Sequence, residues 1–389
     1  MKMEKLSNLI LSIESGARPK GGAIDSGIPS IGAEHLSDTG AFKLTNVKYV
    51  PESFYNEMKS GKISLNDILI VKDGATTGKV SFVNESFPFK KAAINEHVFI
   101  LRIKKSMAYS KYVFHFLRTK SGKDEIMKDF RGATVGGISR QFVEQVKIPL
   151  PPLEEQIQIA TVLSKAENLI AKRKQGIELL DEFVKSTYIE MFIDKGFALE
   201  KLGSLSNKIT DGEHKKPDYK ENGIPFISVT NITKGFLDFN DCKYVSEEDY
   251  NKFIKRCNPE EGDILYTKVG ATYGRAAIVN TNEKFCLYVS VALIKPKKSI
   301  VTPKFLKYSL DHPFIKRQAD KSIKGAGVPD LHLVEIKSFD IPVPPLSLQN
   351  QFAEIVNKVE VLKVKYQKSL EELENLYASL SQRAFRGEL

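Results

Sequence analysis

Two short glycine-rich runs are the parts of this chain that come nearest to a phosphate-binding loop. They read GATTGK at 74–79 and GATYGR at 270–275. A P-loop needs four residues between its glycines and a Ser or Thr directly after its lysine. Here three residues separate the glycines and Val80 follows Lys79. The runs therefore predict no nucleotide site.

A second pattern resembles nuclease chemistry. Asp330, Glu335 and Lys337 follow the acidic and lysine spacing of metal-dependent nucleases, but the first half of the chain carries Gly137 and Phe142 where the two acids would recur. No Asn-Pro-Pro-aromatic tetrapeptide of the adenine methyltransferase kind occurs either. We therefore expect no catalytic residue on this chain.

Metal ligands are also not indicated. The three cysteines never have C-x-x-C spacing, so they are interpreted as packing residues rather than zinc ligands or disulfides. The histidines lack H-E-x-x-H or any other ligand spacing. These residues are Cys242, Cys257 and Cys286, with His35, His97, His115, His214, His312 and His332.

Composition favours a protein with real hydrophobic cores and a polyanionic partner. Of 389 residues, 42% are hydrophobic and 27% charged, and 58 Lys and Arg against 48 Asp and Glu give a net charge of +10. Such a charge is typical of nucleic-acid binding, although a generic basic surface would give it too. No apolar stretch approaches the roughly 20 residues of a membrane helix, and no signal peptide is recognised. We expect a cytoplasmic protein.

The chain is nearly a tandem repeat. GIP at 27–29 recurs at 223–225, KYV at 48–50 recurs at 243–245, DIL at 67–69 recurs at 263–265, and IPLPPL at 148–153 becomes IPVPPL at 341–346. The offset drifts only from 196 (223 − 27) to 193 (341 − 148), so few residues separate the copies in length. Within each copy, short apolar runs alternate with Gly, Asn, Asp and Pro, which is typical of an α+β domain.

Each globular pattern ends at a proline-rich boundary, after which a long helix is predicted. We therefore expect four parts: a domain at 1–150, a helical spacer at 151–195, a second domain at 196–345 and a second spacer at 346–389. Apolar residues in both spacers recur every three or four positions, which predicts a coiled-coil seam rather than a helix lying on its own domain. The seam residues are Leu163, Ile170, Ile177, Leu180 and Val184, then Val356, Leu370, Leu373, Tyr377 and Leu380.

Connectivity predicts the direction of the two helices. Only residues 194–197 separate the first helix from the second domain, so the second helix must run back to pair with the first. This predicts an antiparallel coiled coil with a pseudo-two-fold axis. If 154–192 is all helical, the spacer is about 58 Å long at 1.5 Å per residue, and it would act as a ruler between the domains.

Three stretches resemble the specificity subunit of type I restriction-modification systems. RGATVGGISRQFVEQVKIPLPPLEEQIQIA at 131–160 is very similar to the junction of that subunit's first target-recognition domain with its central helical region. GVPDLHLVEIKSFDIPVPPLSLQNQFA at 327–353 resembles the matching distal junction, and SLSQRAFRGEL at 379–389 resembles the family's carboxyl end.

The resemblance implies two target-recognition domains that each read one half of a bipartite DNA site. It also implies that the helices set the gap and dock two copies of an adenine methyltransferase subunit, with a translocase-nuclease subunit joining for restriction. S-adenosylmethionine, ATP and magnesium would then belong to those partners, and this chain would carry no cofactor and no catalysis. A pseudo-two-fold protein suits two half-sites on a duplex.

Candidate DNA contacts are hydroxyl and cationic side chains on the glycine-rich loops and basic residues in other loops. Each glycine-rich loop lies between two apolar runs, so it is interpreted as the turn of a hairpin. The candidates are Thr76, Thr77, Lys79, Thr272, Tyr273 and Arg275 on the loops, and Arg18, Lys20, Lys90, Arg131, Arg140, Lys215, Lys216, Lys316, Arg317 and Lys324 elsewhere.

Other functions remain open at this point. A specificity subunit of a methylation-only system would keep DNA recognition without a restriction partner. A coiled-coil scaffold without DNA binding is a different class, and an autonomous nuclease is a third. Salt-dependent DNA binding, methylation by a partner and cleavage by the purified chain distinguish them.

Overall fold

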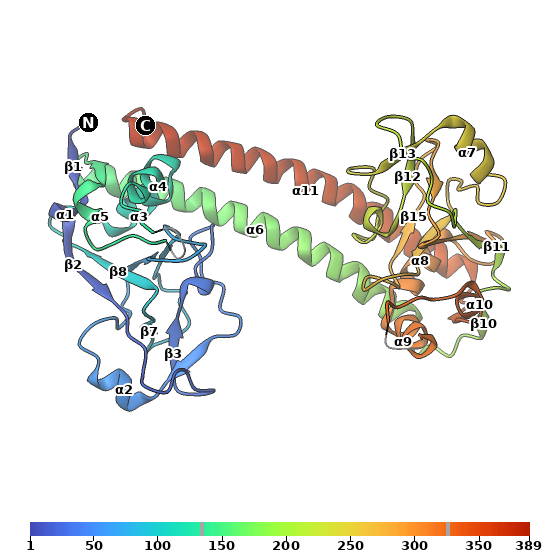
Figure 1. The fold of residues 1–389 in the computed structure, drawn as a ribbon, viewed down its shortest axis with the longest axis horizontal. Helices are drawn as coiled ribbons and strands as arrows, with labels where there is room; N and C mark the ends of the chain where they lie inside the picture. Colours follow the sequence, from blue (N-terminus) through green and yellow to red (C-terminus); the bar gives the residue numbers. More distant parts are fainter. Residues whose placement is uncertain (133–135, 324–326) are drawn as a thin grey trace. The chain divides into compact units, whose positions relative to one another are not determined.

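The computed structural model describes residues 1–132, 136–323 and 327–389. Its contacts divide the chain into two compact units. Unit 1 comprises Met1–Lys174 with Lys368–Leu389, and unit 2 comprises Gln175–Gln367. Each unit is one globular domain together with part of each of two long helices, α6 (Leu153–Phe192) and α11 (Leu346–Arg386) (Figure 1). In the part of the chain that the structure describes, no helix is long and apolar enough to cross a membrane.

Unit 1 contains a four-stranded sheet of order β2-β8-β5-β6, a three-stranded sheet of order β4-β3-β7 and the pair β1-β9. Its strands are β1 (Met3–Lys5), β2 (Ile10–Ser15), β3 (Ile28–Ile31), β4 (Lys48–Val50), β5 (Ile68–Val71), β6 (Val80–Phe82), β7 (Ala93–Ile94), β8 (Val98–Ile103) and β9 (Lys147–Pro149). Its shorter helices are α1 (Leu6–Leu9), the 3-10 turn η1 (Ala33–His35), α2 (Glu52–Glu57), α3 (Ser110–Arg118), α4 (Lys120–Met127) and α5 (Phe142–Gln145).

Unit 2 repeats this topology with sheets of order β11-β17-β14-β15, β13-β12-β16 and β10-β18. Its strands are β10 (Leu199–Lys201), β11 (Ser206–Asp211), β12 (Ile224–Ile227), β13 (Lys243–Val245), β14 (Ile264–Thr267), β15 (Ala276–Ile278), β16 (Cys286–Leu287), β17 (Val291–Pro296) and β18 (Asp340–Pro342). Its shorter helices are the 3-10 turn η2 (Val229–Asn231), α7 (Glu247–Phe253), α8 (Pro303–Asp311), α9 (Pro313–Ser322) and α10 (Leu333–Lys337).

Strands β5 and β14 each lie between two hydrophobic clusters. In β5, Ile68 and Ile70 join the cluster that includes α3 and α6, whereas Leu69 joins the cluster behind it. In β14, Ile264 and Leu265 divide between two clusters in the same way. Side chains alternate across a strand, so a run of consecutive apolar residues is required where both faces are buried.

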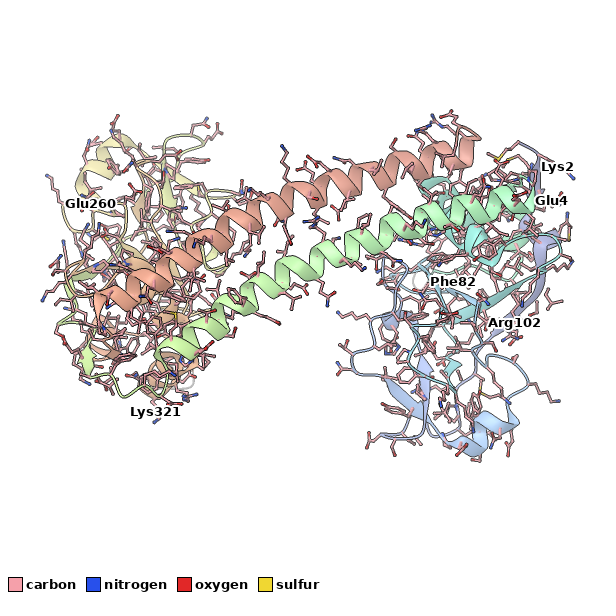
Figure 2. All side chains as sticks on the ribbon, turned by 180° about the vertical axis from the view of Figure 1, so that it is seen from behind. Lys2, Glu4, Phe82, Arg102, Glu260 and Lys321 are labelled. Atoms are coloured by element: carbon pink, nitrogen blue, oxygen red, sulfur yellow. The ribbon has the colours of Figure 1, made fainter. Side chains whose placement is uncertain are left out.

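The amino-terminal strand connects unit 1 to its long helix. β1 pairs antiparallel with β9, and Met3 lies opposite Pro149, four residues before α6 begins at Leu153. Figure 2 shows Lys2 and Glu4 beside the first turns of α6, where their side chains form an ion pair at 3.4 Å.

The long helices pair in antiparallel fashion within each unit. In unit 1 the Tyr377 hydroxyl donates to Glu167 at 2.7 Å, and Lys174 forms an ion pair with Glu374 at 2.7 Å. In unit 2 the Lys363 ammonium donates to Asp181 at 2.6 Å. In unit 1 the partner on α11 moves backward as α6 advances, which defines the antiparallel direction. The predicted fold class, two repeated α+β domains with two long antiparallel helices, is confirmed.

The predicted seam positions are buried or half-buried in both helices. Fully buried members, such as Leu163, Val184 and Val356, lie where a helix also packs on its domain, and the others are half-buried as in a two-stranded pair. Gly176 lies in the middle of α6, where a Cβ atom would come within 2.9 Å of the Tyr366 ring. The glycine therefore makes room for an aromatic side chain of α11.

Candidate nucleic-acid interface

Both glycine-rich runs form hairpin turns, as the sequence predicted. In unit 1, β5 and β6 pair antiparallel, and Gly78 N–H donates to Val71 C=O at 2.9 Å to close the turn. Gly74 and Gly78 have φ values of 91° and 83°, which a side chain would strain. In unit 2, Gly274 N–H donates to Thr267 C=O at 2.8 Å in the corresponding turn. Both tips therefore have glycine at positions where the backbone requires it.

Two other loops fix the base of the hairpin in unit 1. Lys72 N–H donates to His97 C=O at 2.8 Å, and Lys72 C=O accepts from Ile138 N–H at 2.8 Å. Gly74 N–H donates to Gly136 C=O at 3.0 Å. The hairpin, the loop before β8 and the loop before α5 thus converge at one edge of the domain.

Unit 2 repeats the same three hydrogen bonds. Lys268 N–H donates to Ser290 C=O at 3.0 Å, Lys268 C=O accepts from Leu331 N–H at 2.9 Å, and Gly270 N–H donates to Pro329 C=O at 2.9 Å. The two units therefore present one backbone scaffold twice. The side chains on this scaffold differ between the units. Such a difference is expected when two related domains bind different ligands of one chemical class.

Unit 1 carries a chain of charged side chains along this edge. His97 Nδ1 lies 2.5 Å from Asp73 Oδ1, and Lys72 Nζ lies 3.4 Å from Asp73 Oδ2. Glu96 connects His97 to Arg18, at 3.7 and 3.9 Å. Arg18, Glu96 and His97 border a hollow of about 260 Å³, whose lining also includes Glu34, Lys48 and Asn95.

Unit 2 carries a different ionic cluster at the equivalent place. The Lys268 ammonium is 6% exposed and lies 3.6 Å from Asp211 and 3.5 Å from Asp330. Arg256 contacts the same Asp211 carboxylate at 2.5 Å and His214 Nε2 at 2.8 Å. A buried ammonium is stable only with such partners. The two carboxylates therefore hold the Lys268 side chain in place at the base of the hairpin.

Two loop candidates, Thr77 and Tyr273, make side-chain contacts within the chain itself. Thr77 is 7% exposed, and its hydroxyl donates to Gly74 C=O at 2.7 Å, so it shapes the turn instead of facing solvent. The Tyr273 hydroxyl donates to Asp320, and its ring lies under the Lys316 ammonium at 3.2 Å. These two side chains support the hairpin tips from behind.

The remaining loop candidates lie nearer to solvent. Thr76 and Lys79 are half-buried, and Lys79 forms an ion pair with Asp38 at 2.9 Å. Thr272 and Arg275 are exposed. Among the described residues, no carboxylate forms an ion pair with the exposed Arg275 guanidinium. Its charge is therefore available to an external anion.

The basic candidates outside the hairpins are mostly exposed. Arg131 contacts Asp129 at 3.0 Å yet is 68% exposed, and Arg140 donates to the Ser15 hydroxyl at 3.1 Å. Lys216 lies 5.9 Å from the Tyr219 ring centroid. Lys20, Lys90, Lys215 and Arg317 are exposed, and Lys316 is half-buried. Lys324 lies outside the described residues.

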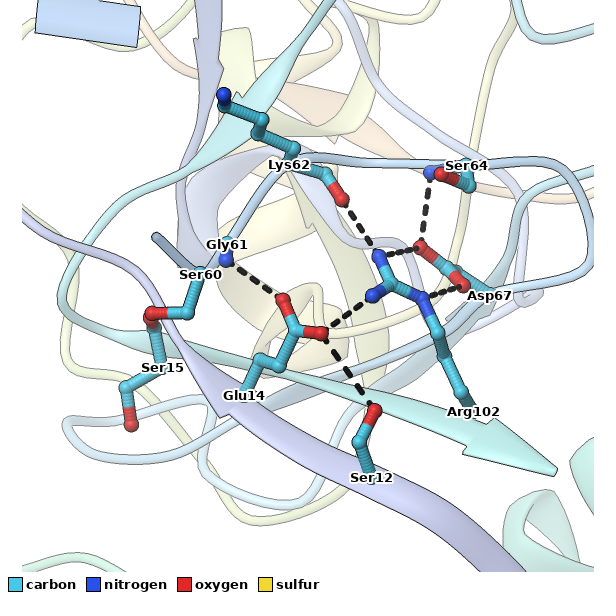
Figure 3. Close-up of polar contacts among 9 residues, drawn as sticks. All are labelled: Ser12, Glu14, Ser15, Ser60, Gly61, Lys62, Ser64, Asp67 and Arg102. Atoms are coloured by element: carbon cyan, nitrogen blue, oxygen red, sulfur yellow. Dashed lines mark hydrogen bonds and ion pairs between the residues drawn. The ribbon is translucent and has the colours of Figure 1, made fainter. Parts of the chain in front are cut away.

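An ionic brace behind the edge holds the strands of unit 1 in place (Figure 3). Arg102 on β8 contacts both oxygens of Asp67 at 3.0 and 3.1 Å, donates to Lys62 C=O at 2.7 Å and also contacts Glu14 on β2. Burial raises the pKa of Asp67, and the contact with Arg102 opposes that rise. In unit 2, Lys295 contacts Asp263 at 2.6 Å in the same role.

Several residues that organise this edge are not predicted by the sequence patterns. His97 and Asp73 in unit 1, and Lys268 in unit 2, were not singled out as contacts. One sequence signal does mark this position: Lys72 and Lys268 are the same residue type and each lies two residues before its glycine-rich run. Asp330 was noticed only in a nuclease-like pattern, but Glu335 of that pattern accepts from His332 N–H at 2.7 Å and caps α10. The described ranges contain no group of three or more His, Cys, Asp or Glu residues that could hold a metal ion.

Comparison with known proteins identifies the class. The chain belongs to the type I restriction modification DNA specificity domain family, whose pattern matches residues 22–179 and 195–375. One match falls in each copy of the repeat, as the sequence predicted.

Individual relatives agree with this class. The chain is 25% identical over 367 residues to the type I restriction enzyme MjaVIII specificity subunit of Methanocaldococcus jannaschii, covering 89% of this chain and 82% of that one. It is 25% identical to the EcoKI specificity subunit of Escherichia coli, covering 94% and 83%.

Two solved structures share the fold. The S subunit from M. genitalium aligns with a TM-score of 0.58 and 15% identity, over 99% of this chain and 96% of that chain. A chain from a structure of type I R-M complex assembly and conformational transition aligns with a TM-score of 0.61 and 18% identity, over 100% and 98%.

Proposed function

We propose that this chain reads a bipartite, interrupted DNA sequence and directs partner subunits of a type I restriction-modification complex to it. In this proposal 1–150 and 196–345 are the two target-recognition domains, and 151–195 with 346–389 are the helical spacers. The observation that carries the proposal is the duplicated backbone scaffold at the hairpin edge, which bears different side chains in the two units. One fold that reads two half-sites needs this combination.

Phosphate contacts would come from the exposed basic residues near this edge. Arg275 and Thr272 flank the hairpin tip of unit 2, and Arg18, Lys20 and Arg131 lie on loops near the corresponding edge of unit 1. Such contacts position a protein on DNA without reading sequence. Base reading is the task of the side chains that differ between the units.

The helices would serve two further roles. Their exposed apolar residues fit the docking of two methyltransferase subunits, because water-facing Leu, Val and Phe side chains on a helix favour burial against a partner. These residues are Leu169, Leu179, Phe183, Val361, Val364 and Leu376. The length of α6 and α11 would set the unread gap, and a translocase-nuclease subunit would join for restriction. S-adenosylmethionine, ATP and magnesium would be bound by the partners, and the complex would act in the cytoplasm.

The deciding experiment is co-expression of this chain with its methyltransferase subunit, followed by single-molecule sequencing of methylated DNA. A bipartite methylated motif that vanishes without this chain is expected. Exchange of one recognition domain with that of a relative should change one half-site only. Removal of one heptad from both helices should change the gap only.

Other outcomes would redirect the assignment. Methylation that is unchanged without this chain would contradict the specificity role and favour a scaffold. Purification of the tagged chain without any translocase-nuclease subunit would favour a methylation-only system.

A further inference from the structure

One bridge pair at the base of each hairpin differs between the units in an informative way. In unit 1, Asp73, directly before the glycine-rich run of the hairpin, forms a backbone bridge with Gly137, in the loop before α5 at the junction with the long helix. In unit 2, Val269 is on the hairpin side and Asp330 on the junction side. Each unit thus places one carboxylate at this bridge, but from opposite strands.

The two carboxylates are not equally available. Both oxygens of Asp73 are engaged, one by His97 and one by Lys72, and its side chain is 23% exposed. The Asp330 side chain is 45% exposed. Its Oδ1 reaches Lys268 at 3.5 Å, and within the described ranges its Oδ2 accepts no hydrogen bond. Among the described residues, the second oxygen of this half-exposed carboxylate is therefore left to accept a hydrogen bond from outside the chain.

Charge compensation engages only one oxygen of Asp330. Asp211, 5% exposed, lies 3.6 Å from Lys268 but also contacts Arg256, so Asp330 helps to balance these two cations through its Oδ1. A second, half-exposed carboxylate beside a DNA-binding edge repels phosphate, so it weakens affinity unless it makes a compensating contact. The contact that DNA offers to a carboxylate is an exocyclic amino group, such as cytosine N4 in the major groove.

We propose that Asp330 is a specificity-determining residue of unit 2 that accepts a hydrogen bond from an exocyclic amino group of cytosine or adenine. Lys268 is its positioning residue, because its ammonium holds Oδ1 and leaves Oδ2 free. The carboxylate also rejects a base that presents a carbonyl oxygen at that place, since two acceptors repel. This inference rests on the proposed function and adds which side chain reads and which chemical group it reads.

The test compares the wild-type chain with Asp330→Asn in the co-expressed methyltransferase complex, by sequencing of methylated DNA. An amide both donates and accepts, so D330N should relax one base pair of the half-site read by unit 2, by about 10- to 100-fold in relative methylation. Every other position of the motif should be unchanged. Glu283→Gln, at an exposed residue on the loop that follows β15, removes one carboxylate charge outside the hairpin edge and should leave the whole motif unchanged.

A second measurement separates reading from folding. Binding of purified complex to duplexes that differ at the relaxed position should lose its preference in D330N and keep its melting temperature. An unchanged motif in D330N would overturn the inference while the proposed function stood. Loss of the entire half-site together with a lower melting temperature would also overturn it, because Asp330 would then be structural. A wild-type chain that yields no chain-dependent motif would remove the proposed function itself.

Discussion

Unit 1 and unit 2 differ most where they face solvent and least where they are braced internally. Gln156 and Gln349 occupy equivalent positions near the start of α6 and α11, and both are buried. Asp67 and Asp263 each accept from a basic residue of the neighbouring strand. In contrast, the carboxylate of the bridge pair at the hairpin base is Asp73, before the glycine-rich run, in unit 1, but Asp330, before α10, in unit 2. The duplication has therefore kept the groups whose loss would leave unpaired buried atoms, and has changed charged residues at the hairpin edge, where we propose that DNA binds.

A second contrast lies where the long helices meet the domains. In unit 1, Arg118 contacts Glu167, and the buried His115 donates or accepts with the Ser164 hydroxyl at 3.0 Å. In unit 2, Tyr308 stands where His115 would be (308 − 193 = 115), beside a hollow of about 600 Å³. A polar histidine in one unit and a tyrosine in the other give the two units different sensitivities to pH.

The largest effect is expected at the buried glutamines. The Gln156 side chain accepts from Tyr109 N–H at 2.9 Å and donates to Pro151 C=O at 2.8 Å. Gln156→Ala leaves both backbone groups unpaired, which costs about 2–6 kcal/mol of unfolding free energy at about 1–3 kcal/mol each. Chemical denaturation measures the loss, and hydrogen exchange should locate it in unit 1. Gln158→Ala, an exposed neighbour on α6, should change little.

The same substitution in unit 2 sharpens the comparison. Gln349 accepts from Thr302 N–H at 2.8 Å and donates to Ile300 and Pro344 carbonyls at 2.9 Å. Gln349→Ala should therefore destabilise unit 2 by a similar amount, with exposed Gln351→Ala as its control. A large effect in one unit alone would show that the repeat does not preserve the energetic role of this residue.

Close backbone approach at equivalent glycines should give the next largest effect. A Cβ atom on Gly16 would lie 2.1 Å from Ile94 C=O, and one on Gly212 would lie 2.0 Å from Leu287 C=O. Backbone must move to admit the methyl group, so each alanine variant should lose up to about 3 kcal/mol of stability. Thermal unfolding measures this loss. Gly327→Ala meets no atom within 4 Å and should be neutral by comparison; an equal loss there would argue against the steric explanation.

Acid should destabilise unit 1 through His115. Burial lowers the pKa of His115 from 6.5 to about 3, and the positive charges of Arg118 and Lys111 contribute, although Glu167 lies 3.7 Å from Nδ1. Because the folded pKa lies below the unfolded one, the stabilisation is complete above pH 6.5 and is lost as the pH falls toward 3. Between pH 6.5 and 5 the loss is about 2 kcal/mol, at 1.36 kcal/mol per unit.

Replacing this residue by its counterpart in the repeat isolates the effect. His115→Tyr should flatten the dependence of unit 1 on pH in this window, measured by hydrogen exchange at pH 6.5 and 5. If the wild type and the variant lose the same stability on acidification, the titrating group lies elsewhere.

The sequence predicted those features of the fold that follow from periodicity and repetition. The heptad seams predicted the long helices, and the apolar runs around 74–79 and 270–275 predicted the hairpins. The edge could be predicted only in part, because its contacts join residues far apart in the chain. Asp73 meets His97, and Lys268 meets Asp211 and Asp330, through loop geometry that no local pattern encodes. Thr77 shows the same limit, because a turn can direct a polar side chain inward, where this hydroxyl donates to Gly74 C=O, as easily as outward.

The smallest effect is expected from single phosphate contacts at the hairpin tips, and it distinguishes the two tips. Arg275 is exposed, whereas the Lys79 charge is already compensated by Asp38 at 2.9 Å. Arg275→Ala should lower the slope of log affinity against log salt by about 0.9, the value of one phosphate contact. Lys79→Ala should lower it less, because DNA would have to displace Asp38 first. Lys105→Ala, exposed and outside the hairpin edge, is the control. Equal slopes for all three variants would mean that the tips do not touch the backbone of DNA, and the reading face would then have to be sought at another edge of each unit.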